Sequence, residues 1–505
     1  MSWLTELLAE PLRVATQRPW PRAIATPNIW NRACQLLADG RLSLLGLWGD
    51  TTAVHMALLQ DEPFDLGVLT IETTKGTFPS VGAVHPPAIR LERTIQDLFG
   101  LTAMDARDQR PWLDHGRWKT RHPCAIQPQA AAGPSPYVFL PVEGESLHQI
   151  PVGPVHAGII EPGHFRFTAN GETVVRLEQR LGYVHKGIEQ LMVGADLERA
   201  ASLAGRTSGD STVAYAIAFA RAVEAALNVA VPPRAAWLRA LMAELERLAN
   251  HFGDFGAICN DASFSMMHNQ CGLLREETLR AAAATFGHRL MMDRVVPGGV
   301  AVDLGPDGEK QLRHLLKEVG RLFPQLVELY DNTASLQDRS VATGRLTAAL
   351  ARQFGAGGFV GRASGRPFDA RRAVAYPPYD QLKFDVPVLE EGDVNARVWI
   401  RIREVEQSLS LIEQILAQAP AGPLRVPVIP VAGDTREGLA LVESFRGDVL
   451  AWVRFDSDGR LARCHLRDPS WFQWRLLEAV IEGNIVADFP LCNKSFNCSY
   501  SGHDL

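Results

Sequence analysis

Apolar residues recur at helical spacing along much of the chain after residue 195. This spacing gathers apolar side chains on one face and predicts helices that pack through that face. The predicted helices cover 196–204, 211–230, 233–253, 273–286, 308–329, 343–354 and 394–417. We therefore expect a helical bundle in the larger part of the chain.

Short apolar runs with turn residues at their ends predict strands on either side of this bundle. Residues 43–49 and 64–73 are runs of this kind. Hairpins with an Asn-Gly or Asp-Gly turn are predicted at 165–177 and 448–466. The predicted fold class is therefore α+β.

A change of composition divides the chain into parts. Residues 121–152 are rich in Pro, Ala and Gly, which do not sustain a helix, so they predict an extended linker. Residues 1–120 include a predicted helix at 89–99 closed by Gly100, and we expect them to form a small α+β domain. Residues 153–505 then form a large helical-bundle domain with peripheral β-hairpins.

Composition and charge narrow the classes of function. The formal net charge of −6 leaves no basic surplus for nucleic acid. The seven cysteines do not resemble a secreted disulfide framework, and no secretory signal is expected. The apolar stretch 213–231 contains Arg221 and Glu224, so we expect a helix buried in protein, with no direct transmembrane segment in this chain.

The C-terminal segment has the pattern of a metal motif with one cysteine replaced. Cys498 and Ser501 have the spacing at which a C-x-x-C pair supplies two thiolates. A free cysteine is more often a small buried residue than a ligand, so the structural interpretation of Cys498 is favoured over a metal or redox role. Cys492 lies outside this spacing.

Ordered motifs across residues 153–505 resemble a known family. The motifs are GPVH at 153–156, LGYVHKGIE at 181–189, VPPRA at 231–235, ELERLANH at 244–251, RASG at 362–365, YD at 379–380, FDVP at 384–387, GDVNAR at 392–397 and RGD at 446–448. They resemble the large subunit of nickel-iron hydrogenases and its homologue in complex I. The block LERTIQDLFGL at 91–101 is similar to the small peripheral subunit of complex I. A fusion of the two is familiar from bacterial complex I and from formate-hydrogenlyase-type, group 4 energy-converting hydrogenases.

The resemblance implies a metal site whose ligands are mostly replaced. In the hydrogenases, two C-x-x-C pairs give four thiolates to a nickel-iron centre. The first pair corresponds here to Ser208 and Ser211, and the second to Cys498 and Ser501. Serine hydroxyls stay protonated near neutral pH and are weak ligands. We therefore expect no nickel-iron centre and no firmly bound cofactor in this chain.

In the complex I branch, the resemblance implies a quinone site between a histidine and a tyrosine. His156 matches the histidine, but Gly209 stands where the tyrosine would be, so a bound quinone would lose one hydrogen-bond donor. The candidate cofactor-binding residues are His156, Arg206, Gly209 and Asp210. Arg206 either positions an anionic ligand or bridges buried carbonyl groups.

His156 and Glu189 are the candidate catalytic residues. The resemblance makes Glu189 a proton relay near the hydrogenase centre. The alternatives for this carboxylate are an ion pair with Lys186 or a place at a helix end, and both interpretations remain open.

Other charged residues share helix faces. These residues are Glu244, Arg247 and His251 on one helix, and Asp393, Arg397, Arg401 and Glu404 on another. The first set forms either a polar channel lining or, as we favour, a buried row of ion pairs, and the second fits plain helix-face pairs. His185 and His503 are expected to be hydrogen-bonded structural groups.

The resemblance implies a role in a redox complex. We expect a subunit of a complex I-like or energy-converting-hydrogenase-related complex that couples electron transfer to ion translocation. A small iron-sulfur subunit would cover the cleft, antiporter-like membrane subunits would lie beyond it, and the chain would sit on the cytoplasmic face of the cell membrane. Two alternatives remain: a catalytically silent structural or coupling subunit, and an active hydrogenase large subunit, which the serines disfavour.

Overall fold

The computed structural model describes residues 2–131, 133–430, 432–433 and 435–505. Helices and several small sheets surround one continuous cluster of buried apolar side chains. The predicted α+β class is confirmed. Ala132, in the predicted linker, lies outside the described residues.

The N-terminal part of the chain folds around a sheet with strand order β1-β3-β6-β5-β4. Its strands are β1 (Leu12–Val14), β3 (Arg22–Ile24), β4 (Ser43–Gly49), β5 (Ala53–Gln60) and β6 (Asp65–Glu72). The helices that pack on it are α1 (Trp3–Ala9), α2 (Pro27–Ala38) and α3 (Ile89–Phe99). Helix α3 has the predicted bounds, and Gly100 closes it in the left-handed region at φ 70°.

A second sheet joins the two ends of the chain. Its antiparallel strands are β16 (Arg436–Glu443), β17 (Asp448–Phe455) and β18 (Leu461–Arg467). Strand β2 (Gln17–Arg18), from the N-terminal part, pairs with β16 in parallel. Nearby, Arg22 forms a buried ion pair with Glu437 at 2.7 Å, and Trp48 stacks on His465 with ring centroids 4.8 Å apart.

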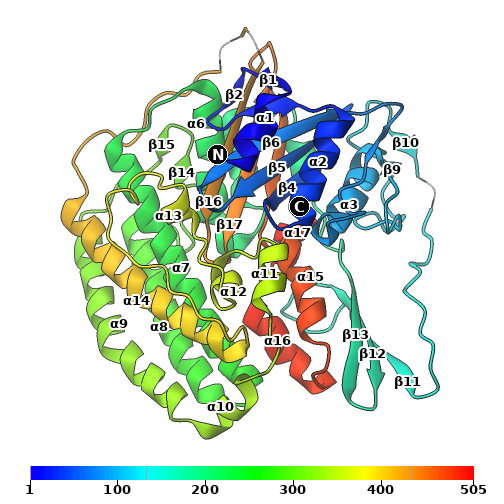
Figure 1. Cartoon of the computed structure of the whole chain (residues 1–505). Helices are drawn as coiled ribbons and strands as arrows, with labels where there is room; N and C mark the ends of the chain where they lie inside the picture. The colour runs from blue at the N-terminus through cyan, green and yellow to red at the C-terminus, as the bar shows by residue number, and fades with distance from the viewer. Residues whose placement is uncertain (1, 132, 431, 434) are drawn as a thin grey trace.

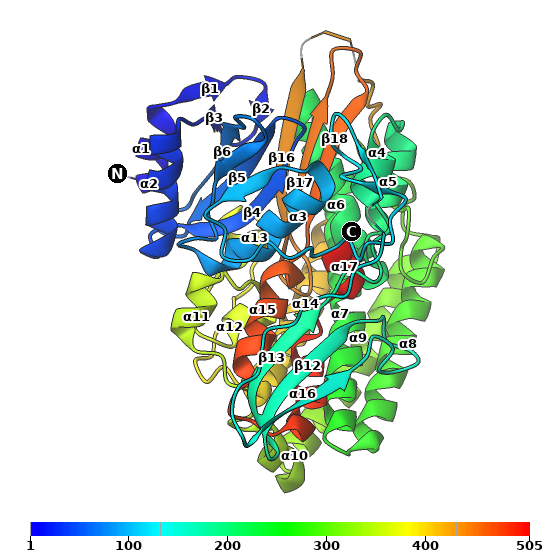
Figure 2. The ribbon, with the colours of Figure 1, turned by 90° about the vertical axis from the view of Figure 1, so that its right-hand side faces the viewer.

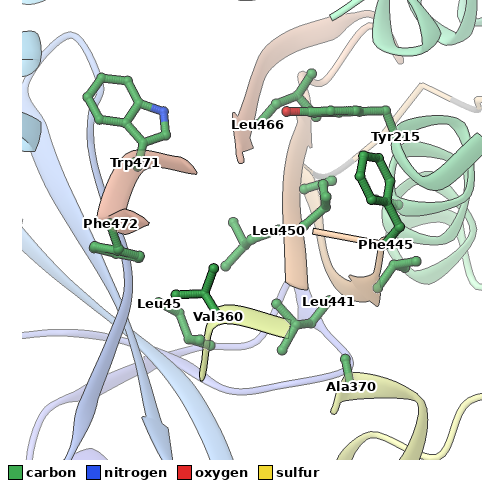
Figure 3. Packing of buried hydrophobic residues seen from close by; sticks show 14 of the residues in the cluster. Leu45, Tyr215, Val360, Ala370, Leu441, Phe445, Leu450, Leu466, Trp471 and Phe472 are labelled. Carbon is green, nitrogen blue, oxygen red and sulfur yellow. The ribbon is translucent and has the colours of Figure 1, made fainter. Parts of the chain in front are cut away.

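This second sheet lies inside the hydrophobic core. Figure 3 shows Leu441 and Leu450 of its strands between Tyr215 on one side and Leu45 of β4 on the other, and all four are buried. The division into 1–120, 121–152 and 153–505 stays a prediction. Residues from both sides of it share this sheet and this core.

Long helices form a bundle beside the second sheet (Figure 1). They are α6 (Thr212–Leu227), which packs on β16 and β17, and α7 (Pro233–Asp261), α8 (Ser265–Phe286), α9 (Gly308–Asp331) and α14 (Val394–Gln418). The predicted helices in these regions are confirmed, but α7 and α8 are longer than predicted. Glycines in α7 serve close packing instead of ending the helix, because a Cβ at Gly256 would lie 2.8 Å from Cβ of Cys271 in α8.

The predicted helix at 343–354 is wrong in extent. Only α11 (Ala348–Gln353) is helical there, and the side chain of Thr347 caps its first turn. Residues 343 and 344 lie in a turn, with Gly344 in the left-handed region at φ 59°, and the backbone N–H of Leu346 then donates to the carbonyl oxygen of Gly392. Shorter helices nearby are α10 (Ala334–Ser340), α12 (Gly358–Arg362) and α13 (Ala370–Ala373).

A third sheet and the C-terminal helices lie side by side (Figures 1 and 2). The sheet comprises β11 (Leu147–Val152), β12 (His164–Asn170) and β13 (Thr173–Arg180), and the helices are α15 (Ser470–Val480), α16 (Phe489–Phe496) and α17 (Tyr500–Asp504). The hairpins predicted at 165–177 and 448–466 are confirmed as β12–β13 and β17–β18. In the part of the chain that the structure describes, no helix has both the length and the hydropathy needed to cross a membrane.

The remaining elements are short. They are α4 (Ile188–Met192), α5 (Leu197–Gly205), β7 (Thr77–Pro79), β8 (Thr102–Met104), β9 (Thr120–Arg121), β10 (Gln129–Ala130), β14 (Val295–Val296) and β15 (Gly299–Val300). Helix α5 begins as predicted, with the Asp196 side chain accepting from the N–H of Arg199.

The close contact of β16 with α6 yields a first prediction. A Cβ at Gly438 would lie 1.8 Å from the carbonyl oxygen of Ala222, so Gly438→Ala should lower the free energy of unfolding by about 1–3 kcal/mol or more. Gly320 on α9 is the matched control, because a Cβ there meets nothing within 4 Å and Gly320→Ala should stabilise by about 0.5–1 kcal/mol. Denaturant unfolding of both variants measures this, and equal stabilities would contradict the packing described.

Candidate functional site

A cleft of about 620 Å³ opens between three segments of the chain. These are the loop between β11 and β12, the turn that follows α5, and the stretch from α16 to α17. The cleft brings together His156, Ser208, Gly209, Asp210, Cys498 and Ser501, all singled out from the sequence. The structure thus gathers most of the candidate residues in one place.

Hydroxyl groups connect the two serine-containing segments. Ser208 Oγ lies 2.8 Å from Ser499 Oγ, across the boundary between the segments. Ser208 Oγ also donates to Asp210 at 2.8 Å, and Ser499 Oγ lies 3.5 Å from Ser501 Oγ. The positions that resemble ligand sites therefore lie close together, and all three of their serine hydroxyls have polar partners at the junction, since Ser211 Oγ also lies 3.4 Å from Asp210 Oδ1.

A buried arginine joins the two serine-containing segments through hydrogen bonds to both. Arg446, which follows β16, is buried and donates to Asp210 Oδ1 at 2.8 Å and to Ser211 Oγ at 3.1 Å. Its Nε donates to the carbonyl oxygen of Asn497 at 2.5 Å. Burial alone would raise the pKa of Asp210, but Arg446 lowers it to about 2, so this partly exposed carboxyl is ionised at neutral pH.

Cys498 is a buried thiol at the wall of the cleft. Burial raises the pKa of the Cys498 thiol above its usual range, and the pKa of Cys492 to about 12 for the same reason. Both groups are therefore protonated at neutral pH and are weak nucleophiles and weak ligands in this state. Among the described residues, no three His, Cys, Asp or Glu side chains are grouped in a way that could hold a metal ion.

His156 meets a tyrosine that the sequence reasoning missed. The Nε2 atom of His156 lies 3.2 Å from Oη of Tyr500. Burial lowers the pKa of His156, so its imidazole is neutral at neutral pH, and burial raises the pKa of Tyr500, so its phenol keeps its proton. The cleft thus offers a phenol beside the histidine, although Gly209 itself has no side chain. Tyr500 lies between Cys498 and Ser501 in the sequence, and this position could have identified it as a residue of the cleft.

Glu189 lies outside the cleft lining, in an ion-pair cluster of its own. Its carboxylate accepts from Arg463 and from Nδ1 of His465, both on β18 and both at 2.7 Å. Burial would raise the pKa of Glu189, but Arg463 and His465 lower it to about 2. The predicted partner Lys186 instead donates to the carbonyl oxygen of Thr207. An ion pair is present, with partners that the local sequence did not indicate.

Arg206 also points away from the cleft. Its guanidinium is exposed and pairs with Asp293 at 2.7 Å. Arg206 does not line the cleft, where it could position an anionic ligand, and it does not join buried carbonyl groups. The structure therefore matches neither role considered from the sequence. The two histidines expected to be hydrogen-bonded are so: His185 bonds the backbone carbonyl oxygen of Asp504, and His503 accepts from Nε1 of Trp112 at 3.3 Å.

Glu244, Arg247 and His251 of α7 belong to a buried row of ion pairs, as favoured from the sequence. The charged residues of α14 were expected to pair along their own helix, and this is wrong: Arg401 pairs with Asp254 of α7 at 3.2 Å, and Arg397 donates to Ser495 Oγ at 2.9 Å. Glu404 accepts from His251 and from Arg362, and Glu244 pairs with Arg371 and with Arg247. Asp393 instead caps the first turn of α14 through the N–H of Ala396. These groups hold the two helices against β16 through its last residue, Glu443, which pairs with Arg362.

Comparison with known proteins places the chain in a family. A family model described as the 49 Kd subunit of the respiratory-chain NADH dehydrogenase matches residues 263–437 and 431–504. A second, described as nickel-dependent hydrogenase, matches residues 186–258. Formate hydrogenlyase subunit 5 of Escherichia coli (strain K12) is 30% identical over 444 residues, which cover 86% of this chain and 78% of that protein. The chain belongs to the family of complex I 49 Kd and nickel-dependent hydrogenase subunits.

Both branches of the family are represented among its relatives. Carbon monoxide-induced hydrogenase of Rhodospirillum rubrum is 30% identical over 70% of this chain and 98% of its own length. An NADH-quinone oxidoreductase subunit of Roseiflexus sp. (strain RS-1) is 32% identical over 67% of this chain and 94% of its own length. The hydrogenase model covers Ser208 and Ser211, and the 49 Kd model covers Cys498 and Ser501, so the cleft is built from both matched regions.

The residues present do not fit the nickel-iron centre of the hydrogenase branch. That centre needs four deprotonated sulfur ligands, whereas this cleft supplies one protonated thiol and three hydroxyls. Ser208 and Ser211 are also hydrogen-bonded to the ion pair of Asp210 and Arg446. No step of any reaction is therefore assigned to such a centre in this family member.

The Glu189 cluster yields a second prediction. Glu189→Gln leaves Arg463 buried without its counter-charge and should lower the free energy of unfolding by about 3–5 kcal/mol at pH 7. Because the folded pKa of Glu189 lies below its ordinary value of 4.5, its contribution is complete above pH 4.5 and is lost as the pH falls towards 2. The difference between wild type and variant should therefore shrink across that window in urea titrations. Glu276→Gln, in an exposed pair, is the control, and an equal loss in both variants would contradict this account.

Proposed function

We propose that this chain is a subunit of a membrane-associated redox complex, in which its cleft binds an organic electron acceptor and holds no nickel-iron centre. Its family membership and the names of its relatives, an NADH-quinone oxidoreductase subunit and a formate hydrogenlyase subunit, support a place in such a complex. The observation that carries the proposal is the neutral His156 beside Tyr500 in a cleft whose ligand positions are hydroxyls.

The mouth of the cleft supports the presence of a partner subunit. The loop between β11 and β12 exposes Val155 by 78% and Ile159 by 96% of their surface. Large apolar side chains that gather at an exposed site often mark an interaction surface. We assign this surface to a small iron-sulfur subunit that delivers electrons. Antiporter-like membrane subunits would lie beyond it, and the chain would be peripheral on the cytoplasmic face of the cell membrane.

The His156 and Tyr500 pair has the chemistry that a quinone-like acceptor needs. Reduction of such an acceptor adds protons as well as electrons, and its carbonyl oxygens gain negative charge as the electrons arrive. The phenol and the neutral imidazole use one of their two protons in the hydrogen bond between them, and the other proton can be donated to those oxygens to stabilise the charge. The electrons would come from the iron-sulfur partner, and the coupling to ion translocation would follow through the membrane subunits.

A substitution at the cleft tests this function. In the purified complex, His156→Ala should lower acceptor-dependent electron transfer by about 10²-fold or more, and Tyr500→Phe should lower it less, because the imidazole remains. His148→Ala, on the exposed part of β11, is the matched control. Steady-state reduction of a soluble quinone analogue is the measurement.

The same experiment separates the second candidate function. A catalytically silent structural or coupling subunit is favoured by the Arg446 and Asp210 ion pair, which ties the cleft segments together without a bound group. If His156→Ala leaves electron transfer intact while the complex stays assembled, the acceptor site is refuted and the structural role stands.

A further inference from the structure

A second cavity of about 600 Å³ lies at the C-terminal end of α6, beside the start of α7 and strand β2. It shares no residue with the cleft at His156. The loop that carries Tyr376 and Tyr379 forms another wall. Its size is in the range of cavities that hold small organic ligands.

One cation in this cavity lacks a counter-charge. Arg221 is partly buried, its guanidinium lies 4.7 Å from the ring centroid of Tyr376, and its Nε is buried without a hydrogen-bond partner. Within the described residues it forms no ion pair closer than 4.0 Å, and burial lowers its pKa, as expected for a cation short of an acid. The N–H groups of this guanidinium are thus left to an acceptor from outside the chain, either water or a ligand.

Glu224, an acidic residue that lines the same cavity, already has other partners. Glu224 pairs with Arg239 at 2.6 Å and accepts from the backbone N–H of Gly298 at 2.8 Å. Arg18, at the rim of the cavity, is exposed and donates to the side chain of Asn228. The cavity therefore has an excess of positive charge.

One part of the wall is apolar. Ile217, Ala240 and Ala243 are buried residues of α6 and α7 that line the cavity. The hydroxyl of Tyr379 is occupied, since it donates to Glu244 at 2.7 Å, and the hydroxyl of Tyr376 accepts from the N–H of Glu443. Arg221 is the partly buried charged residue of the lining for which the described chain supplies no acceptor.

From this arrangement we infer that the cavity binds a small organic monocarboxylate. The carboxylate pairs with the guanidinium of Arg221, whose planar fork suits two parallel hydrogen bonds. An aliphatic body of a few carbons packs against Ile217, Ala240 and Ala243. This site is independent of the acceptor cleft and of the function proposed for it.

Calorimetric titration of the full-length chain with octanoate tests the site, with 1-octanol as the uncharged probe of the same length. Octanoate should bind, 1-octanol should bind at least about tenfold more weakly, and Arg221→Met should weaken octanoate binding about tenfold or more. The control is Arg280→Met, which removes an exposed arginine of α8 and should leave octanoate binding unchanged.

The fold of the variant is verified by circular dichroism and thermal unfolding. Arg221→Met removes the contact with the Tyr376 ring but no ion pair of the described chain, so its melting temperature should stay close to that of the wild type. The absence of octanoate binding, equal binding by wild type and Arg221→Met, or equal affinity for octanoate and 1-octanol would overturn the inference. A marked loss of thermal stability in Arg221→Met would also overturn it, because the arginine would then serve the fold.

Discussion

The ion pair between Arg446 and Asp210 is the interaction on which the cleft depends. Arg446 comes from the turn between β16 and β17, Asp210 comes from the turn before α6, and the same guanidinium bonds the backbone after α16. The N–H groups of a buried guanidinium need hydrogen-bond acceptors. Because the acceptors of Arg446 come from these segments, the guanidinium holds the segments together. The serine hydroxyls then complete the hydrogen bonds around the carboxylate. The cleft keeps its shape through charges and hydroxyls that belong to the chain itself.

This member of the family keeps the arrangement of the two ligand-motif segments, although most of the thiolate positions hold serine. The two segments that resemble ligand motifs still meet, and Ser208 bonds Ser499 across them. The proton-accepting capacity of Glu189 is also reduced, because Arg463 and His465 keep it ionised at neutral pH. In the cleft, His156 and Tyr500 form a neutral hydrogen-bonded pair.

Much of the fold was predictable because it depends on local pattern. Helical spacing predicted α3, α6, α9 and α14 closely, and the turn pairs predicted both hairpins. The site was predictable only in part, because its contacts join residues far apart in sequence. Tyr500 lies 344 residues from His156, and Arg463 lies 274 residues from Glu189. No periodicity encodes such pairs. Helix α7 was predicted too short for a related reason, since its glycines are explained only by the neighbouring helix.

The central claim is that hydroxyls and an ion pair take the place of the nickel-iron centre in this member of the family. Elemental analysis of the purified, assembled complex by inductively coupled plasma mass spectrometry tests it most directly, with the iron of the proposed iron-sulfur partner as an internal reference. The account predicts iron together with nickel far below one atom per chain. Nickel in a one-to-one ratio with the chain would contradict it.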